Sequence, residues 1–288
     1  MSDPRIVNLA RTLVHYSVEA RPGDHVAVLG GPSAAPLIRE VFREVLRAGA
    51  HPYPIVAIDG LPEILFSEAS DEQLRHVSRI DRMVRSEFEA MISIGSATNT
   101  RSLGGVDPSR QRIRSQAYGD LMRTFMERSA AGQFRWVGTL YPTEAYAQDA
   151  EMSLEDFSDY VYGAVFADTP DAVAAWRVVH DEQQRLVDWL AGRRRVRVEG
   201  PNVDMTLSIE GRTFINSDGH HNMPSGEIFT GPVEDSAQGW VRFTYPAVTA
   251  GREVEGIELA FERGKVVRAT ARKNEGFLLS QLDTDAGS

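Results

Sequence analysis

The sequence has no cysteine among its 288 residues. Disulfide bonds, thiolate metal sites and cysteine nucleophiles are therefore excluded. The chemistry of this protein must be sought among its other side chains.

The sequence also lacks a long apolar run. No stretch approaches the ~20 apolar residues that a membrane-spanning helix needs. The N-terminus, from Met1 to Asn8, has no basic stretch followed by an apolar one, as a secretory signal would have. We therefore expect a cytoplasmic protein with no membrane partner.

Positive charge is in short supply. Forty-one acidic residues stand against 31 Lys and Arg, so the formal net charge is -10. A field of this sign repels phosphate backbones and is compatible with the attraction of divalent cations. We therefore expect no nucleic-acid partner. The 42% hydrophobic and 25% charged residues are typical of a soluble globular chain with a sizeable core.

Strand and helix patterns alternate over residues 1–192. Short apolar strands are expected at residues 25–29, 53–58, 89–94 and 134–139, with amphipathic helices between them and a long helix over 171–190. Such alternation forms parallel βαβ units with right-handed crossovers. We therefore predict an α/β domain with a parallel sheet over residues 1–192. His180 lies in the long helix, where a lone histidine is more often packed or exposed than catalytic.

Two glycine loops follow strands of this sheet, where small ligands bind in such folds. Gly30-Gly31 lacks the third glycine of a dinucleotide fingerprint, and the chain has no Gly-Lys-Ser/Thr phosphate loop. Asp59 stands at the end of the second strand, where an acid can hold a ribose. The poor motif match nevertheless makes tight turns the better interpretation of Gly30-Gly31 and Gly95-Ser96.

The pattern becomes strand-rich from Val196 onward. Alternating segments at 203–209, 239–245 and 254–261 are followed by a hairpin into 265–271, and a short helix is expected over 274–282. We predict a smaller β-rich (α+β) domain over residues 193–288. Its sheet would have open edges, so it is interpreted as C-terminally incomplete.

The stretch from Asn216 to Ser236 is the candidate functional segment. Asp218-Gly219 and Pro224-Ser225-Gly226 are strong turn signals. Glu227 follows them and begins a short apolar run. A carboxylate held between turns suits a metal ligand or a catalytic base, although stretches rich in Asp, Gly and Asn are most often only turns.

Other polar residues of this stretch have weaker claims. Adjacent residues of a strand point to opposite faces, so at most one of His220 and His221 could face a site. His221, Glu234 and Asp235 are therefore candidates for the cleft or for orienting a ligand. A solvated strand entrance is an equally good explanation for the two carboxylates.

The run from Asn222 through Asp235, with its Pro224-Ser-Gly-Glu227 motif, resembles the signature of the thermophilic metalloaminopeptidase family, the aminopeptidase T and AmpS group. The hairpin at Val254–Ala271 is similar to the one that follows in that family. The segment Leu282–Gly287 is similar to the lead-in to the family's second metal motif. The resemblance covers the whole chain and is specific from about Phe214 onward.

The resemblance implies an exopeptidase that removes N-terminal residues from peptides with water activated by two divalent metals, from among zinc, cobalt, manganese and magnesium. It makes Glu227 a metal ligand and implies a homodimer. The family's other ligands, a second glutamate, histidines, a tyrosine and an aspartate, would lie beyond Ser288, so we expect the chain as given to lack peptidase activity on its own.

Two other functions stay open. Iron-dependent ring-cleaving dioxygenases resemble these peptidases in overall architecture and use one ferrous ion with two histidines and a carboxylate. A non-catalytic binding protein, built from the α/β domain and a degenerate half-domain, is the second alternative. The Pro-Ser-Gly-Glu motif favours the peptidase.

Overall fold

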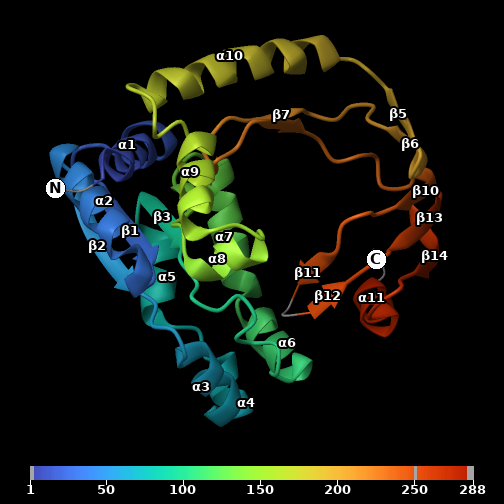
Figure 1. Ribbon diagram of the computed structural model, residues 1–288, viewed down its shortest axis with the longest axis horizontal. Helices are drawn as coiled ribbons and strands as arrows, with labels where there is room; N and C mark the ends of the chain where they lie inside the picture. Colours follow the sequence, from blue (N-terminus) through green and yellow to red (C-terminus); the bar gives the residue numbers. More distant parts are fainter. Residues whose placement is uncertain (1–2, 250–251, 284–288) are drawn as a thin grey trace. The chain divides into compact units, whose positions relative to one another are not determined.

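The computed structural model describes residues 3–249 and 252–283 (Figure 1). The chain folds into two compact units. The first unit contains the residues up to Gln183 together with Ser217–Glu227, and the second contains Gln184–Asn216 together with the residues from Ile228 onward. The segment with the Pro-Ser-Gly-Glu motif thus belongs to the first unit. The predicted domain boundary at residues 192 and 193 stays a prediction.

The first unit is built on a five-stranded sheet of order β2-β1-β3-β4-β8, in which every paired strand is parallel. The prediction of a parallel-sheet α/β fold is confirmed. The strands are β1 (His25–Gly30), β2 (His51–Val56), β3 (Ala90–Gly95), β4 (Arg135–Leu140) and β8 (Asn222–Met223).

Helices connect the first four strands, as the alternating pattern predicts. Many begin at a capping side chain; Asp3, for example, accepts a hydrogen bond from the Arg5 N–H at the start of α1. The α-helices are α1 (Pro4–Thr12), α2 (Ala35–Arg47), α3 (Leu61–Glu68), α4 (Asp71–Arg75), α5 (Arg79–Glu87), α6 (Pro108–Ala117), α7 (Gly119–Ala130), α8 (Glu144–Asp149), α9 (Leu154–Ala164) and α10 (Ala172–Leu190). A π-helix at Leu13–Ser17 extends α1, and a 3₁₀ turn at Pro32–Ala34 precedes α2.

Alternate residues of each strand point to opposite sides of the sheet, and helices cover the side chains on both faces. Val26 and Val28 of β1 are fully buried in a cluster with side chains of α1, α2, α9 and α10. Ala27 of the same strand joins a second cluster, with Phe88, Phe125 of α7 and Phe134. The result is a sheet between two layers of helices, with α2 drawn beside β1 and β2 in Figure 1.

The edge strand β2 is protected by its sequence. The N–H groups of His51 and Ala57 donate to carbonyls of Asp24 and Gly30, toward β1. Pro52 and Pro54 occupy the alternate positions of the strand, at which an N–H group would point away from the sheet. Proline has no N–H, so this edge offers few donors to another strand.

The second unit has a five-stranded antiparallel sheet of order β14-β13-β10-β6-β5. The predicted β-rich region is confirmed. Its strands are β5 (Arg195–Gly200), β6 (Val203–Ser208), β10 (Gln238–Arg242), β13 (Glu258–Glu262) and β14 (Lys265–Thr270), with β11 (Ala247–Thr249) and β12 (Arg252–Val254) as a separate pair and α11 (Glu275–Leu282) after them. The short strands β7 (Ile215–Ser217) and β9 (Glu227–Phe229) pair where the chain passes between the units.

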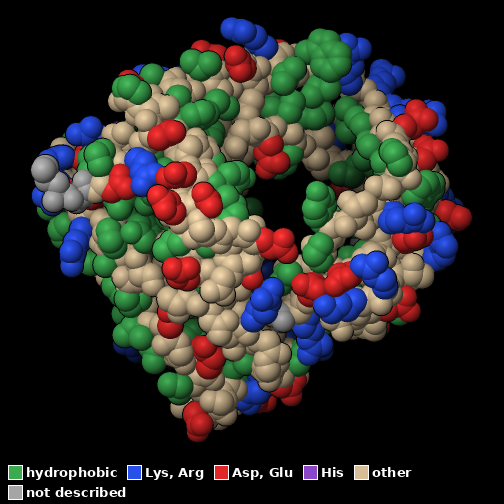
Figure 2. All heavy atoms as spheres, viewed as in Figure 1, with side chains coloured by type: hydrophobic (Ala, Val, Ile, Leu, Met, Phe, Trp, Pro, Cys, Tyr) green, Lys and Arg blue, Asp and Glu red, His purple; other side chains and the backbone are tan. Residues whose placement is uncertain are grey.

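Acidic and basic side chains are interspersed over the surface seen in Figure 2. Several form exposed ion pairs in the second unit, such as Lys273 with Glu253 and Arg242 with Glu258, each with a short N···O distance. Within the described ranges, no helix is long and apolar enough to cross a membrane.

Candidate functional site

Glu227 lies at the end of a turn whose backbone is held at several points. The carbonyl of Ser217 accepts hydrogen bonds from the Gly226 N–H at 3.0 Å, from Ser225 Oγ at 2.7 Å and from Gln183 Nε2 of α10 at 3.1 Å. Gly226 takes φ +108°, which favours glycine. The turn thus fixes the backbone around Glu227, whose own side chain is exposed.

The preceding turn is anchored in the core of the first unit. Met223, 1% exposed, joins the cluster beside β4, where β8 pairs with Gly138 and Thr139. Gly219 has φ +103°, and a Cβ there would stand 2.8 Å from the Met223 side chain and 3.4 Å from that of Trp176. The positive φ favours glycine here, and a larger residue would also have to displace the end of the Met223 side chain. The core therefore positions the segment that leads to Glu227.

A buried carboxylate organises this turn. Asp218 Oδ2 lies 2.6 Å from His180 Nδ1 of α10, and its Oδ1 lies 2.7 Å from His220 Nδ1. The hydroxyl of Tyr16 donates to the Asp218 carbonyl at 3.0 Å. This His180–Asp218–His220 network joins α10 and the π-helix to the turn.

The network shifts the pKa values of Asp218 and His220. Burial pushes the pKa of Asp218 upward, but hydrogen bonds with His220 and His180 outweigh it and hold that pKa at about 2. The hydrogen bond with Asp218 raises the pKa of His220 in turn. Burial also raises the pKa of Tyr16. Asp218 is therefore a carboxylate at neutral pH, and its charge favours the protonated form of His220.

The expectation that His220 and His221 point to opposite faces is wrong. Both residues lie in bends rather than in a strand, so the two-residue alternation does not apply to them. They line the same cleft. His221 is exposed and stacks on Trp136, with ring centroids 4.9 Å apart and planes 6° from parallel.

His180 is a functional candidate that the sequence analysis passed over. It stands on one face of α10 with Gln183, three residues on, whose side chain also bonds the turn. A polar stripe at this spacing on a helix was the available signal. Its partner Asp218 is 38 residues away, and no local pattern joins the two.

Glu234 and Asp235 belong to the second unit and are exposed. Glu234 Oε2 lies 2.6 Å from Arg212 Nη2. A hydrogen bond from its own backbone N–H and the charge of Arg212 hold the pKa of Glu234 below its usual range. The proposed part of His221, Glu234 and Asp235 in orienting a ligand stays a prediction.

The described residues do not by themselves fit a metal ion. Over residues 3–249 and 252–283, no three His, Asp or Glu side chains come together as a metal site. Glu227 offers one oxygen ligand, whereas metals such as zinc are usually held by three or four protein groups.

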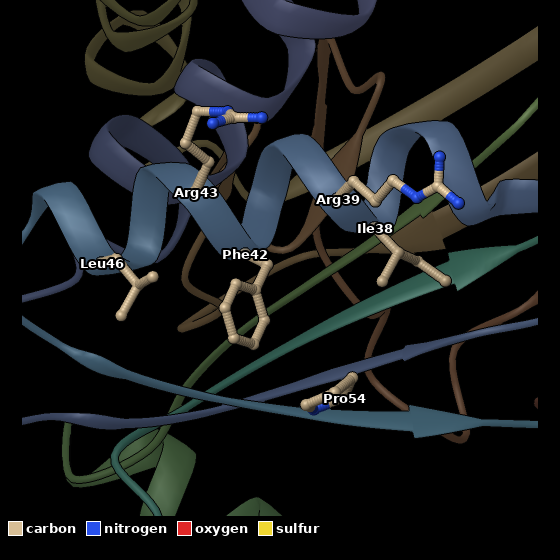
Figure 3. Close-up of a pocket in the computed structure, with 6 residues that line it drawn as sticks. All are labelled: Ile38, Arg39, Phe42, Arg43, Leu46 and Pro54. Atoms are coloured by element: carbon tan, nitrogen blue, oxygen red, sulfur yellow. The ribbon is translucent and has the colours of Figure 1, made fainter.

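Other hollows of the first unit have different chemistry. An apolar groove of about 430 Å³ is lined by residues of α2 and by Pro54 of β2. Figure 3 shows Phe42 and Leu46 pointing from the helix toward the strands. The lining of the groove holds two arginines but no carboxylate or imidazole. The glycine loops close on each other instead, since the Gly31 N–H donates to Ser96 Oγ at 2.9 Å.

The parallel sheet of the first unit, the antiparallel sheet of the second and the Pro-Ser-Gly-Glu turn are the features from which the family of this protein can be identified. Residues 2–288 match the family described as thermophilic metalloprotease (M29). The chain belongs to this family, and the resemblance inferred from the signature segment is confirmed.

Particular relatives are named aminopeptidases. Aminopeptidase 2 from Geobacillus stearothermophilus is 28% identical over 301 residues, which cover 97% of this chain and 73% of the relative. Aminopeptidase T from Thermus thermophilus is 25% identical over 303 residues, which cover 97% of this chain and 74% of the relative. AmpS from Bacillus subtilis is 24% identical, with 97% and 73% covered.

A solved structure has the same fold. Wild-type AmpT from Thermus thermophilus superposes with a TM-score of 0.83 at 22% identity, covering 98% of this chain and 75% of that one. At this identity the likeness establishes the architecture.

Proposed function

We propose that the chain is a metal-dependent aminopeptidase that hydrolyses N-terminal residues from peptides. Membership of a metalloprotease family and relatives named aminopeptidases support this proposal. The structural observation that supports a role for a particular residue is the position of Glu227. Its exposed carboxylate follows a turn that hydrogen bonds and the core of the first unit hold in place.

The proposal assigns Glu227 as a ligand of one of two divalent metal ions that activate the attacking water. A glutamate oxygen suits zinc, cobalt, manganese or magnesium better than soft metals. Because Glu227 stands without a metal-binding cluster in the described part of the chain, the proposal requires further ligands from outside those residues. Peptide substrates, a cytoplasmic location and a homodimer complete the proposed picture.

The test compares Glu227→Gln with Glu262→Gln, a matched change at an exposed glutamate of β13. Each variant is made in a protein that includes the segments from which the proposal requires further metal ligands, because the chain alone is expected to be inactive. It is incubated with zinc, cobalt, manganese or magnesium and assayed on a peptide with a free N-terminus and on its N-acetylated form. We expect hydrolysis of the free form only, with Glu227→Gln lowering the rate by about 100-fold or more and Glu262→Gln leaving it unchanged.

Metal analysis of the same samples gives an independent measurement. Glu227→Gln is expected to retain less metal than the unchanged chain, whereas Glu262→Gln retains as much. Hydrolysis that persists both in Glu227→Gln and after chelation would contradict the proposal. A single bound iron with no peptide hydrolysis would instead support the ring-cleaving dioxygenase.

A further inference from the structure

A second cleft of the first unit has polar walls and no assigned role. Its volume is about 190 Å³, below the 300–1,000 Å³ of pockets for drug-sized ligands. It is formed where the π-helix, the start of β4 and the Asp218 turn meet, and the side chains that matter below are Ser17, Glu19, Phe134, Arg135, His220 and His221.

One wall carries positive charge and hydrogen-bond donors. Arg135 is held in place by Asp24, whose Oδ2 lies 2.6 Å from its Nη2, and its Nη1 donates to the Glu19 carbonyl at 3.2 Å. A guanidinium has five N–H groups, so it can donate to a ligand as well. His220 is oriented by Asp218, and their hydrogen bond raises the pKa of this imidazole toward its charged form.

The other wall carries a carboxylate. Glu19 is exposed, and its backbone takes the left-handed conformation with φ +43°, which is uncommon for a residue other than glycine. Such conformations persist where surrounding contacts impose them and cluster at ligand sites. Arg135 donates to the backbone carbonyl of Glu19, while the Glu19 carboxylate lies 3.8 Å from Arg21 Nη2. The charge of this carboxylate also contributes to the raised pKa of His220 on the opposite wall.

Ser17 supplies an observation of a different kind. It ends the π-helix, an element often found at functional sites, and it is only 3% exposed. Among the described residues, its Oγ is the one buried side-chain polar atom without a hydrogen-bond partner. A buried hydroxyl without a partner is destabilising, so a ligand that bonds it would relieve that cost.

We propose that this cleft binds a free amino acid with a small side chain. The ligand's carboxylate is bound by Ser17, Arg135 and His220, its ammonium group by Glu19, and its side chain rests near Phe134. A zwitterion contacts both walls at once, whereas a simple anion or cation makes a charged contact with one wall only. A free amino acid is also the product of the proposed peptidase, so a role in product sensing rests on that function, while the binding itself does not.

Calorimetric titration of the intact chain tests the binding. The chain is first treated with a chelator, so that no metal is present to bind the ligand or to turn it over. L-alanine is compared with propionate, which lacks the ammonium group, and with L-alaninamide, which lacks the carboxylate. We expect both analogues to bind at least about 10-fold more weakly than alanine, because each loses one of the two charged contacts that the ligand makes with the cleft.

Two variants locate the site. Ser17→Ala and Glu19→Gln are each expected to weaken alanine binding by about 5-fold or more, whereas Ser86→Ala and Glu87→Gln on α5 leave it unchanged. Ser17→Ala removes a hydroxyl without a partner, so its unfolding temperature should be equal to that of the unchanged chain or higher.

Three results would overturn the proposal: no binding of alanine at millimolar concentration, equal binding of propionate and alanine, or full binding by both cleft variants. Failure of the proposed peptidase would be seen separately, in the hydrolysis assay with Glu227→Gln.

Discussion

The two units bury their sheets very differently. The first unit covers both faces of its parallel sheet with helices, and most of the buried apolar side chains belong to it. In the described part of the second unit, the buried apolar residues are Ile209, Ala237, Val254 and Ile257. Large side chains such as Phe243 and Tyr245 are exposed there.

This difference shows where the candidate site obtains its rigidity. Burial of apolar surface is the main favourable term in folding, so the first unit has the stronger scaffold. The segment Ser217–Glu227 packs Met223 into the core of the first unit. The residues that precede and follow this segment in the sequence belong to the second unit. A ligand held by the first unit is therefore positioned by a packed core, whereas the second unit depends more on strand pairing.

The largest expected effect separates the two units directly. Trp176→Ala in the first unit removes a side chain that is 1% exposed and donates to the Val165 carbonyl, so we expect a loss of about 3–5 kcal/mol in the free energy of unfolding. Tyr245→Ala in the second unit, at a position 85% exposed, should stay within about 0.5 kcal/mol of the unchanged chain. Urea denaturation of both variants measures the difference, and similar losses would break the comparison.

A smaller effect is expected from the buried network of the first unit. Asp218→Asn removes a carboxylate whose pKa of about 2 lies below its ordinary 3.8, a difference that corresponds to about 2 kcal/mol of stability at neutral pH. We expect this variant to lose about that much, while Asp120→Asn, at a side chain 92% exposed, changes little.

The pH dependence of stability checks the cause. The contribution of Asp218 is present above pH 3.8 and is lost as the pH falls through about 2. The raised pKa of His220 has the opposite sign, since its contribution is present below pH 6.5 and is lost as the pH rises through the raised value. Asp218→Asn should therefore reduce the loss of folding stability both at low pH and above pH 6.5. An unchanged loss of stability above pH 6.5 would show that the network does not produce it.

The smallest expected difference between the two units comes from a pair of near-isosteric changes, one in each sheet. Val137→Thr places a hydroxyl in the fully buried centre of β4 and should cost about 1–3 kcal/mol. Val267→Thr changes a side chain that is 55% exposed in β14 and should cost less than about 0.5 kcal/mol. Hydrogen exchange measured by mass spectrometry would locate each change. Equal protection of the two sheets would remove the distinction between them.

Much of the architecture could be predicted from short-range patterns. The strands expected at 25–29 and 89–94 agree with β1 and β3 to within a residue or two, because a strand buried on both faces is a short continuous apolar run, which is a local pattern in the sequence. The helix expected over 171–190 agrees with α10 for the corresponding reason at period 3.6. The expected capping role of Asn274 is seen only in part: it precedes α11, but its Nδ2 donates to the Glu253 carbonyl instead of its side chain accepting from the helix.

The sequence by itself determined the order of strands and helices and the Pro-Ser-Gly-Glu motif that identifies the family, because these depend on neighbours in the chain. Only the tertiary structure decided that Met223 enters the core of the first unit, that His180 meets Asp218 and that Ser17, Arg135 and His220 share a cleft. These contacts join residues tens to hundreds of positions apart. They follow from which segments pack together, and no local periodicity records that choice.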